Sequence, residues 1–79
     1  MDSNALMRIE QKPLITLGKT IRVLRLQKKL SQEELAHIAE LDRSYVGQVE
    51  RAERNISFKN LCKIADALDV SVSKMTEGI

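Results

Sequence analysis

The sequence predicts a single all-α domain of five helices. With 79 residues the chain is short for more than one domain. One Tyr, one Phe and no Trp leave the core to Leu, Ile, Val and Ala, which favours packed helices over a sheet. Apolar residues also recur at spacings of three and four, the period of an α-helix. We therefore expect a compact five-helix domain over residues 13–79.

The first helix follows a segment without a clear period. Residues 1–12 lack regular apolar spacing, and we interpret them as a flexible N-terminal arm. Pro13 suits the first turn of a helix, where its missing N–H costs nothing. Beyond it, one apolar stripe predicts a helix that runs to about Lys29, namely Leu14, Leu17, Ile21 and Leu24.

Two short helices are predicted next. Ser31 and Glu34 have the spacing of a capping box, in which each side chain bonds the other residue's amide, so a second helix begins here. Asp42 suits the N-cap of a third helix, Arg43 to Arg51. Gly47 falls on the expected outer face of that helix, where it costs about 1 kcal/mol relative to Ala. A close approach to the backbone at this position would explain the glycine, and tolerated sequence drift would explain it almost equally well.

The last two helices each begin after a serine. Residues 52–56 have no helical period and are predicted to form a loop. Ser57 suits the cap of a fourth helix, whose core stripe comprises Leu61, Ile64, Ala65 and Leu68. Ser71 suits the cap of a short fifth helix that holds Val72, Lys74 and Met75.

Composition excludes several classes of function. One Cys, Cys62, and one His, His37, provide no zinc cluster and no internal disulfide, so we expect neither metal nor cofactor, and a reducing cytoplasm. No phosphate-binding glycine loop or catalytic carboxylate pair is present, which argues against an enzyme. No apolar run is long enough for a membrane. Net charge is only +2, but residues 8–29 hold seven bases against one acid, which indicates a phosphate-facing end.

Four stretches together resemble a known family. They are SQEELA from Ser31, LDRSYVGQVER from Leu41, RN at residues 54–55, and LCKIADALDVS from Leu61. This pattern is similar to the lambda-repressor-like (XRE-type) helix-turn-helix regulators of bacteria and phages, and most of all to restriction-modification controller proteins. The resemblance covers residues 17–75. It departs at Ala52, where a glycine commonly ends the third helix.

The resemblance implies roles for individual residues. The third helix would enter the major groove, the second would cross the DNA backbone, and a two-fold dimer would contact half-sites about 34 Å apart. The positions that match base-contacting residues are Arg43, Ser44 and Gln48. Those that match or suit backbone contacts are Gln32, Tyr45, Arg51, Arg54 and Asn55, although Asn55 would fit a turn equally well. Arg25 and Glu50 match an ion pair that ties the first helix to the third.

Elementary chemistry supports the same assignment. Arg43 can donate two hydrogen bonds to guanine and Gln48 can pair with adenine, each contact giving about 1 to 3 kcal/mol of discrimination. A monomer that contacts three or four bases cannot specify one genomic site, so a homodimer is expected. Its interface is predicted at Val70, Val72, Met75 and Ile79. For the two valines, covering the end of the core is an equal alternative.

The sequence thus predicts a DNA-binding transcriptional regulator of double-stranded operators. The preferred form is a restriction-modification controller that binds palindromic operators and regulates its own promoter. Two alternatives of the same class are a phage-type repressor and a DNA-binding antitoxin. An alternative of another class is a protein-interaction module that docks through its third helix. RNA polymerase is a further candidate partner, for a surface around Glu33, Glu34 and His37.

Overall fold

Five helices make up the fold. The computed structural model describes the backbone of residues 3–79 and the side chains from residue 11 onward, so Met1 and Asp2 of the predicted arm lie outside the described residues. The helices are α1 (Ser3–Gln27), α2 (Gln32–Ile38), α3 (Tyr45–Glu50), α4 (Phe58–Ala67) and α5 (Val72–Met75). Residues 3–79 contain no strand. The predicted all-α class with five helices is confirmed.

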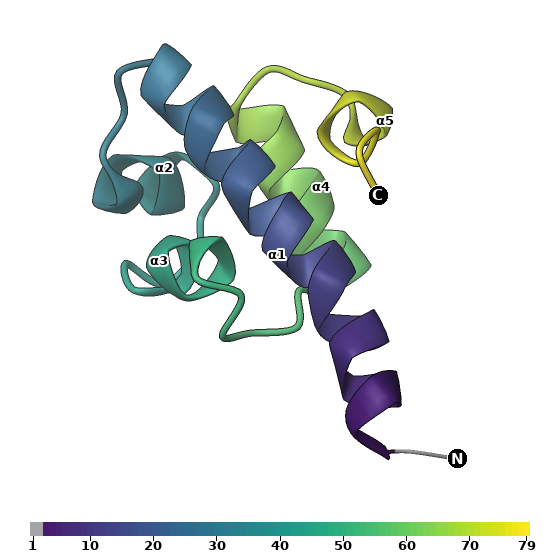
Figure 1. Cartoon of the computed structure of the whole chain (residues 1–79). Coiled ribbons are helices and arrows are strands. Elements are labelled where there is room, and N and C mark those ends of the chain that lie inside the picture. Colours follow the sequence, from purple (N-terminus) through teal and green to yellow (C-terminus); the bar gives the residue numbers. More distant parts are fainter. Residues whose placement is uncertain (1–2) are drawn as a thin grey trace.

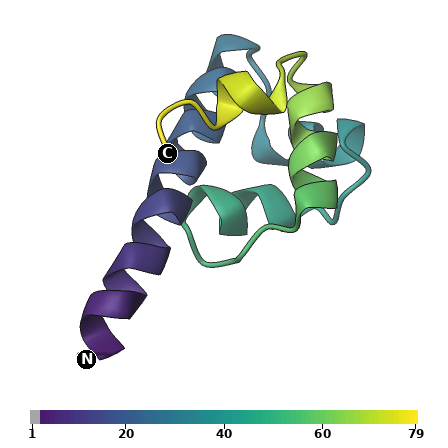
Figure 2. The same ribbon diagram turned by 90° about the vertical axis from the view of Figure 1, so that its right-hand side faces the viewer.

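Helix α1 is longer than predicted. It begins at Ser3, and Pro13 lies inside it rather than at its start. Proline's fixed φ is compatible with a helix, and residues 4–12 are mostly good helix formers. The helix therefore continues past Pro13 and loses only the backbone hydrogen bond that the missing N–H would have made. The N-terminal part of α1 projects beyond the other helices (Figures 1 and 2). The start predicted at Pro13 was therefore wrong, and the flexibility of the arm stays a prediction.

Serine side chains define three helix starts as predicted. The hydroxyls of Ser31, Ser57 and Ser71 each accept a hydrogen bond from the amide three residues on, at 3.0, 3.2 and 2.9 Å. At α2 the box is complete, because Glu34 Oε1 accepts from the Ser31 amide at 2.9 Å. These bonds satisfy amide donors that a helix start leaves unpaired.

The start of α3 differs from the prediction. The helix begins at Tyr45, and its N-cap Ser44 makes no side-chain bond. Asp42 contributes its backbone instead, since its carbonyl oxygen accepts from the Tyr45 amide at 2.9 Å. The cap predicted for Asp42 and the helix start predicted at Arg43 were wrong, because a turn comes first and leaves Arg43 outside the helix.

The first four helices end in the same way. The residue after each C-cap is left-handed, with φ near 57°, and none is glycine: Lys29, Glu40, Ala52 and Asp69. The next amide then bonds a carbonyl five residues back, at 2.8 to 3.1 Å, which is the Schellman arrangement. Ala52 therefore adopts the conformation for which relatives commonly use glycine, and the end of α3 keeps its geometry.

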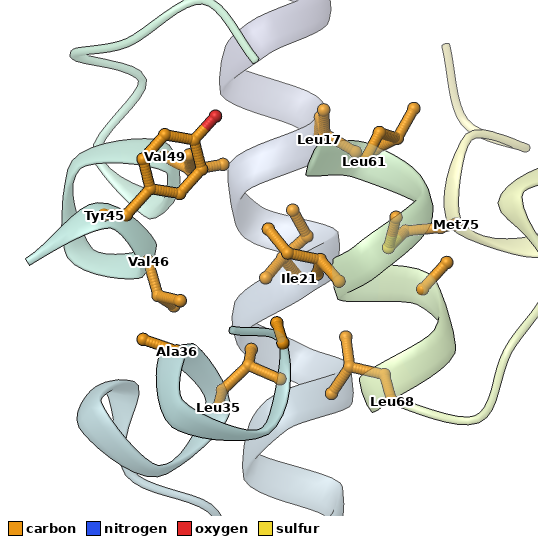
Figure 3. Close-up of a cluster of buried hydrophobic side chains, with 13 residues drawn as sticks. Leu17, Ile21, Leu35, Ala36, Tyr45, Val46, Val49, Leu61, Leu68 and Met75 are labelled. Carbon is orange, nitrogen blue, oxygen red and sulfur yellow. The ribbon is translucent and has the colours of Figure 1, made fainter. Parts of the chain in front are cut away.

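The core is formed around α1 and α4 (Figure 3). Leu17 and Ile21 of α1 face the apolar sides of the other four helices. Tyr45 lies at the edge of this cluster (Figure 3). Its thirteen buried members are Leu17, Ile21, Leu35, Ala36, Ala39, Tyr45, Val46, Val49, Leu61, Ile64, Ala65, Leu68 and Met75. The core therefore joins α2 and α3 to α1 as one body.

Candidate nucleic-acid interface

Helix α3 lies against α1, and α2 lies beside α3 (Figure 1). Gly18 permits the contact between α1 and α3. A Cβ at this position would lie 2.6 Å from the carbonyl oxygen of Glu50 and 2.7 Å from that of Val49. The backbone of α3 therefore rests directly on α1. The sequence interpretation gave Gly18 no role, although a glycine near the core stripe of a helix is the signal that would have indicated a close crossing.

A buried ion pair fixes the angle of α3. Arg25 donates from Nε to Glu50 Oε2 at 2.7 Å and from Nη2 to Oε1 at 3.0 Å, while its Nη1 bonds the Leu30 carbonyl oxygen at 2.8 Å. The two side chains are 9% and 3% exposed. The hydrogen bonds to Glu50 raise the pKa of the Arg25 guanidinium above its ordinary value. The structure thus brings together the two residues that the resemblance paired.

Gln32 extends this network to α2. Its Nε2 donates to Glu50 Oε1 at 3.0 Å, so one carboxylate joins α1, α2 and α3. Gly47 is buried beneath the same side chain: a Cβ there would lie 2.9 Å from Gln32 Oε1 and 3.0 Å from Arg51 Nη1. The close approach expected at Gly47 is therefore made by the chain's own side chains, and the outward placement of this glycine was wrong.

The three predicted base-contacting residues lie at the start of α3. Arg43 is in the preceding turn, with a side chain 83% exposed, and its Nη2 bonds Glu33 Oε1 on α2. Ser44 is exposed at the N-cap, and Gln48 lies one turn further on. The backbone N–H of Gln48 donates to the Ser44 carbonyl oxygen at 3.3 Å. Ser44 and Gln48 therefore share one face of the helix.

The predicted backbone-contacting residues divide into two groups. Tyr45 is only 6% exposed and belongs to the core, with its hydroxyl accepting from Asn60 Nδ2 at 3.0 Å. The guanidinium of Arg54 lies 5.0 Å from the centre of its ring. A shallow pocket of about 450 Å³ joins Tyr45, Arg54, Asn55, Ser57 and Asn60. The sequence interpretation missed Asn60, which looked like one more polar residue on a helix.

Arg51 stands apart from that pocket. It lies at the end of α3 and donates to Glu53, from Nε at 2.7 Å and from Nη2 at 3.3 Å. These hydrogen bonds raise the pKa of the Arg51 guanidinium and lower the pKa of the Glu53 carboxyl. Both side chains are more than half exposed, so solvent and salt screen the pair.

The C-terminal residues require one correction. Met75 is 1% exposed and packs in the core, so it is not available for the dimer interface assigned to it. The spacing of apolar residues placed Met75 on an apolar face of the last helix, but in the structure α5 turns that face toward α1 and α4. Val70 and Val72 are partly buried against the core, and Ile79 is 56% exposed. Among residues 3–79, no helix is long and apolar enough to span a membrane.

Known proteins are similar to this chain in sequence. The sequence profile of the family described as helix-turn-helix matches residues 21–75. Control protein C.SmaI of Serratia marcescens is 46% identical over 59 residues, which is 75% of this chain and 70% of that protein. Control protein C.BamHI of Bacillus amyloliquefaciens is 42% identical over 57 residues, covering 71% and 70%.

A solved structure extends the likeness to three dimensions. The restriction-modification controller protein C.AhdI from Aeromonas hydrophila matches with a TM-score of 0.77 and 50% identity, over 78% of this chain and 94% of that one. The residues that the family profile matches, 21–75, include all of α2 and α3.

Proposed function

The chain belongs to the helix-turn-helix family, among the restriction-modification controller proteins, and is a DNA-binding transcription regulator rather than an enzyme; from this premise we propose that it binds palindromic operators as a homodimer and regulates its own promoter. The observation that carries the proposal is the placement of Arg43, Ser44 and Gln48. Arg43 and Ser44 are exposed just before a helix whose angle a buried ion pair fixes, and Gln48 lies half-buried one turn further on.

Base recognition is assigned to this end of α3. The exposed guanidinium of Arg43 suits O6 and N7 of guanine, and the amide of Gln48 suits N6 and N7 of adenine. Ser44 can donate or accept, so it contributes less to sequence preference. Loss of Arg43 should remove the preference at one base pair of each half-site.

Backbone contacts are assigned to both sides of the recognition helix. On one side, Gln32 keeps one amide hydrogen and its carbonyl lone pairs after bonding Glu50. On the other, Arg54 and Asn55 are exposed at the pocket beside Tyr45, whose hydroxyl hydrogen is available to a phosphate oxygen. Arg51 is the remaining candidate. Such contacts set the register of the protein on DNA without specifying sequence.

Dimerisation is assigned to the C-terminal side, away from α2 and α3 in Figure 1. With Met75 in the core, the accessible apolar residues there are Ile79, the edges of Val70 and Val72, and Val23 of α1. Val23 lines a shallow hollow of about 560 Å³ with Lys74 and Gly78. Sedimentation should show a dimer, and Val23→Lys should shift it toward monomer. A wild-type monomer at high concentration would contradict the assignment.

A contact with RNA polymerase is proposed for the outer side of α2. Ile38 is 51% exposed there and lies with Glu33, Glu34, His37 and Arg43 around an apolar hollow. His37 and Ile38 are not among the residues assigned to DNA above, and a surface of this kind suits a regulator that also activates. We place this activity in the cytoplasm of a bacterial cell. Transcription in vitro with purified polymerase tests it, since Ile38→Asp should lower activation and leave operator binding unchanged.

Selection of bound sequences from random duplexes tests the DNA-binding proposal. A palindrome with half-sites about one helical turn apart is expected. Gel shifts at two salt concentrations complete the test, because phosphate contacts make affinity fall steeply with salt. Absence of any enriched motif, together with binding to a protein partner that salt barely affects, would favour the interaction module. A single unpaired half-site would contradict the dimer.

A further inference from the structure

We propose that Glu33, on the first turn of α2, is a positioning residue for base recognition: it holds the guanidinium of Arg43 toward the base edges and away from the phosphates. This inference rests on the proposed function, because it assigns to Arg43 the guanine contact given above. Glu33 itself touches no base in the proposal. Its role is to determine how strictly Arg43 discriminates.

The geometry leaves room for both partners of Arg43 at once. Only Nη2 of Arg43 bonds Glu33, and Arg43 has no other hydrogen bond among the described residues. A guanidinium has five N–H donors in a planar fork, so Nε, Nη1 and the second hydrogen of Nη2 remain available. One edge of the fork can therefore donate two bonds to guanine while the other stays with the carboxylate.

The burial of the pair indicates that its role is not structural. Glu33 and Arg43 are 62% and 83% exposed, and an exposed ion pair contributes little to stability. The buried pair of Arg25 and Glu50 already fixes the angle between the helices. The exposed pair instead restricts the positions that the long side chain of Arg43 can take.

This restriction acts differently on correct and incorrect sequences. At guanine, Arg43 bonds the base and keeps Glu33, so nothing is lost. No other base offers two acceptors on one edge, so Arg43 gains more there by turning to a phosphate, and that movement would break its bond to Glu33. The carboxylate therefore penalises binding to incorrect sites more than to the operator, as specificity by disfavouring competitors requires.

Glu34 provides a matched control for removing the charge. It lies in the same turn and carries the same charge, but it bonds the Ser31 amide rather than Arg43. Glutamine keeps that capping role, since a capping box accepts either residue. Glu34→Gln therefore removes one negative charge from this end of α2 while the arginine contact stays intact.

The test measures dissociation constants of the full chain on two duplexes, without polymerase. One is the operator obtained by selection, and the other differs only at the base pair whose preference Arg43→Ala abolishes. For Glu33→Gln we expect the ratio of the two constants to fall by about two- to fivefold, the factor that an exposed ion pair of ordinary strength supplies. Glu34→Gln should leave this ratio unchanged. Thermal melts should show that both variants are fully folded at the temperature of the binding measurement.

The double variant Glu33→Gln/Arg43→Ala separates positioning from simple charge repulsion. Without Arg43, loss of Glu33 should alter binding to the changed duplex no more than Glu34→Gln does. The inference is overturned by an unchanged ratio in Glu33→Gln, by an equal loss in Glu34→Gln, or by the same Glu33→Gln effect with and without Arg43. If the wild type selects no motif at all, the proposed function fails and this inference fails with it.

Discussion

The carbonyl oxygen of Glu50 lies 2.6 Å from the point where a Cβ on Gly18 would stand, so α1 and α3 touch backbone to backbone. We predict that Gly18→Ala lowers the free energy of unfolding by about 1 to 3 kcal/mol, because neither backbone can move aside. The better helix propensity of alanine recovers only part of that loss. Urea denaturation monitored by circular dichroism measures the change.

Gly47→Ala is the control for that prediction. Its Cβ would meet the ends of the Gln32 and Arg51 side chains, both of which can turn away. The unfolding free energy should therefore stay unchanged or rise by up to about 1 kcal/mol from helix propensity. Equal losses in the two variants would show that the backbone contact at Gly18 is not the cause.

Arg25 and Arg43 should separate stability from DNA recognition. Arg25→Ala leaves the Glu50 carboxylate buried without its charged partner, and we expect a loss of about 3 to 5 kcal/mol. Arg43→Ala removes an exposed side chain and should change stability by less than about 1 kcal/mol while abolishing the preference at the base pair that Arg43 contacts. Thermal melts and gel shifts test the division. Two variants of equal stability would refute it.

Ala52→Gly should stabilise the protein. Ala52 has φ 58°, a conformation that costs alanine about 1 to 2 kcal/mol and glycine almost nothing. The greater freedom of glycine in the unfolded chain offsets part of the gain, so a net rise of about 0.5 to 1 kcal/mol is expected. Chemical denaturation measures it, and lower stability of the variant would show that the strain at the end of α3 is relieved in another way.

Acid should loosen the start of α2. The Ser31 amide, and then the Ser31 hydroxyl, lower the pKa of Glu34 below its ordinary 4.5. A carboxylate with a depressed pKa stabilises the folded state above pH 4.5, and this contribution disappears as pH falls through the folded pKa. NMR titration should show Glu34 and the Ser31 amide changing together below pH 4.5. In Glu34→Gln, that transition of the Ser31 amide should be absent.

The sequence predicted elements whose cause is local. Three serine caps and the apolar stripes of the first and fourth helices depend on residues a few positions apart, and α2, α4 and α5 begin where the serines placed them. The start of α3 was wrong because Asp42 acts through its backbone, and side-chain statistics do not distinguish that from a cap. The fate of Gly18, Gly47 and Met75 depends on which helix lies across them, and this is a tertiary property.

The site was predictable to the same extent. Arg43 and Ser44 are exposed because they lie in the turn before α3, and Gln48 is half-buried within this short helix. The bond from Asn60 to Tyr45 joins residues fifteen positions apart and left no trace in the periodicity. The pair of Glu33 with Arg43 crosses a turn whose geometry only the folded chain reveals.

The exposed pair of Arg43 with Glu33 should weaken with salt, and the buried pair of Arg25 with Glu50 should not. Dissolved ions reach Arg43 and Glu33, which are mostly exposed, but not Arg25 and Glu50, which are almost completely enclosed. Rising ionic strength should therefore lower the affinity for phosphates first and reduce base discrimination with it, while the angle of α3 stays the same. At high salt the protein would remain fully folded yet unable to tell one sequence from another, and dilution alone would restore its selectivity.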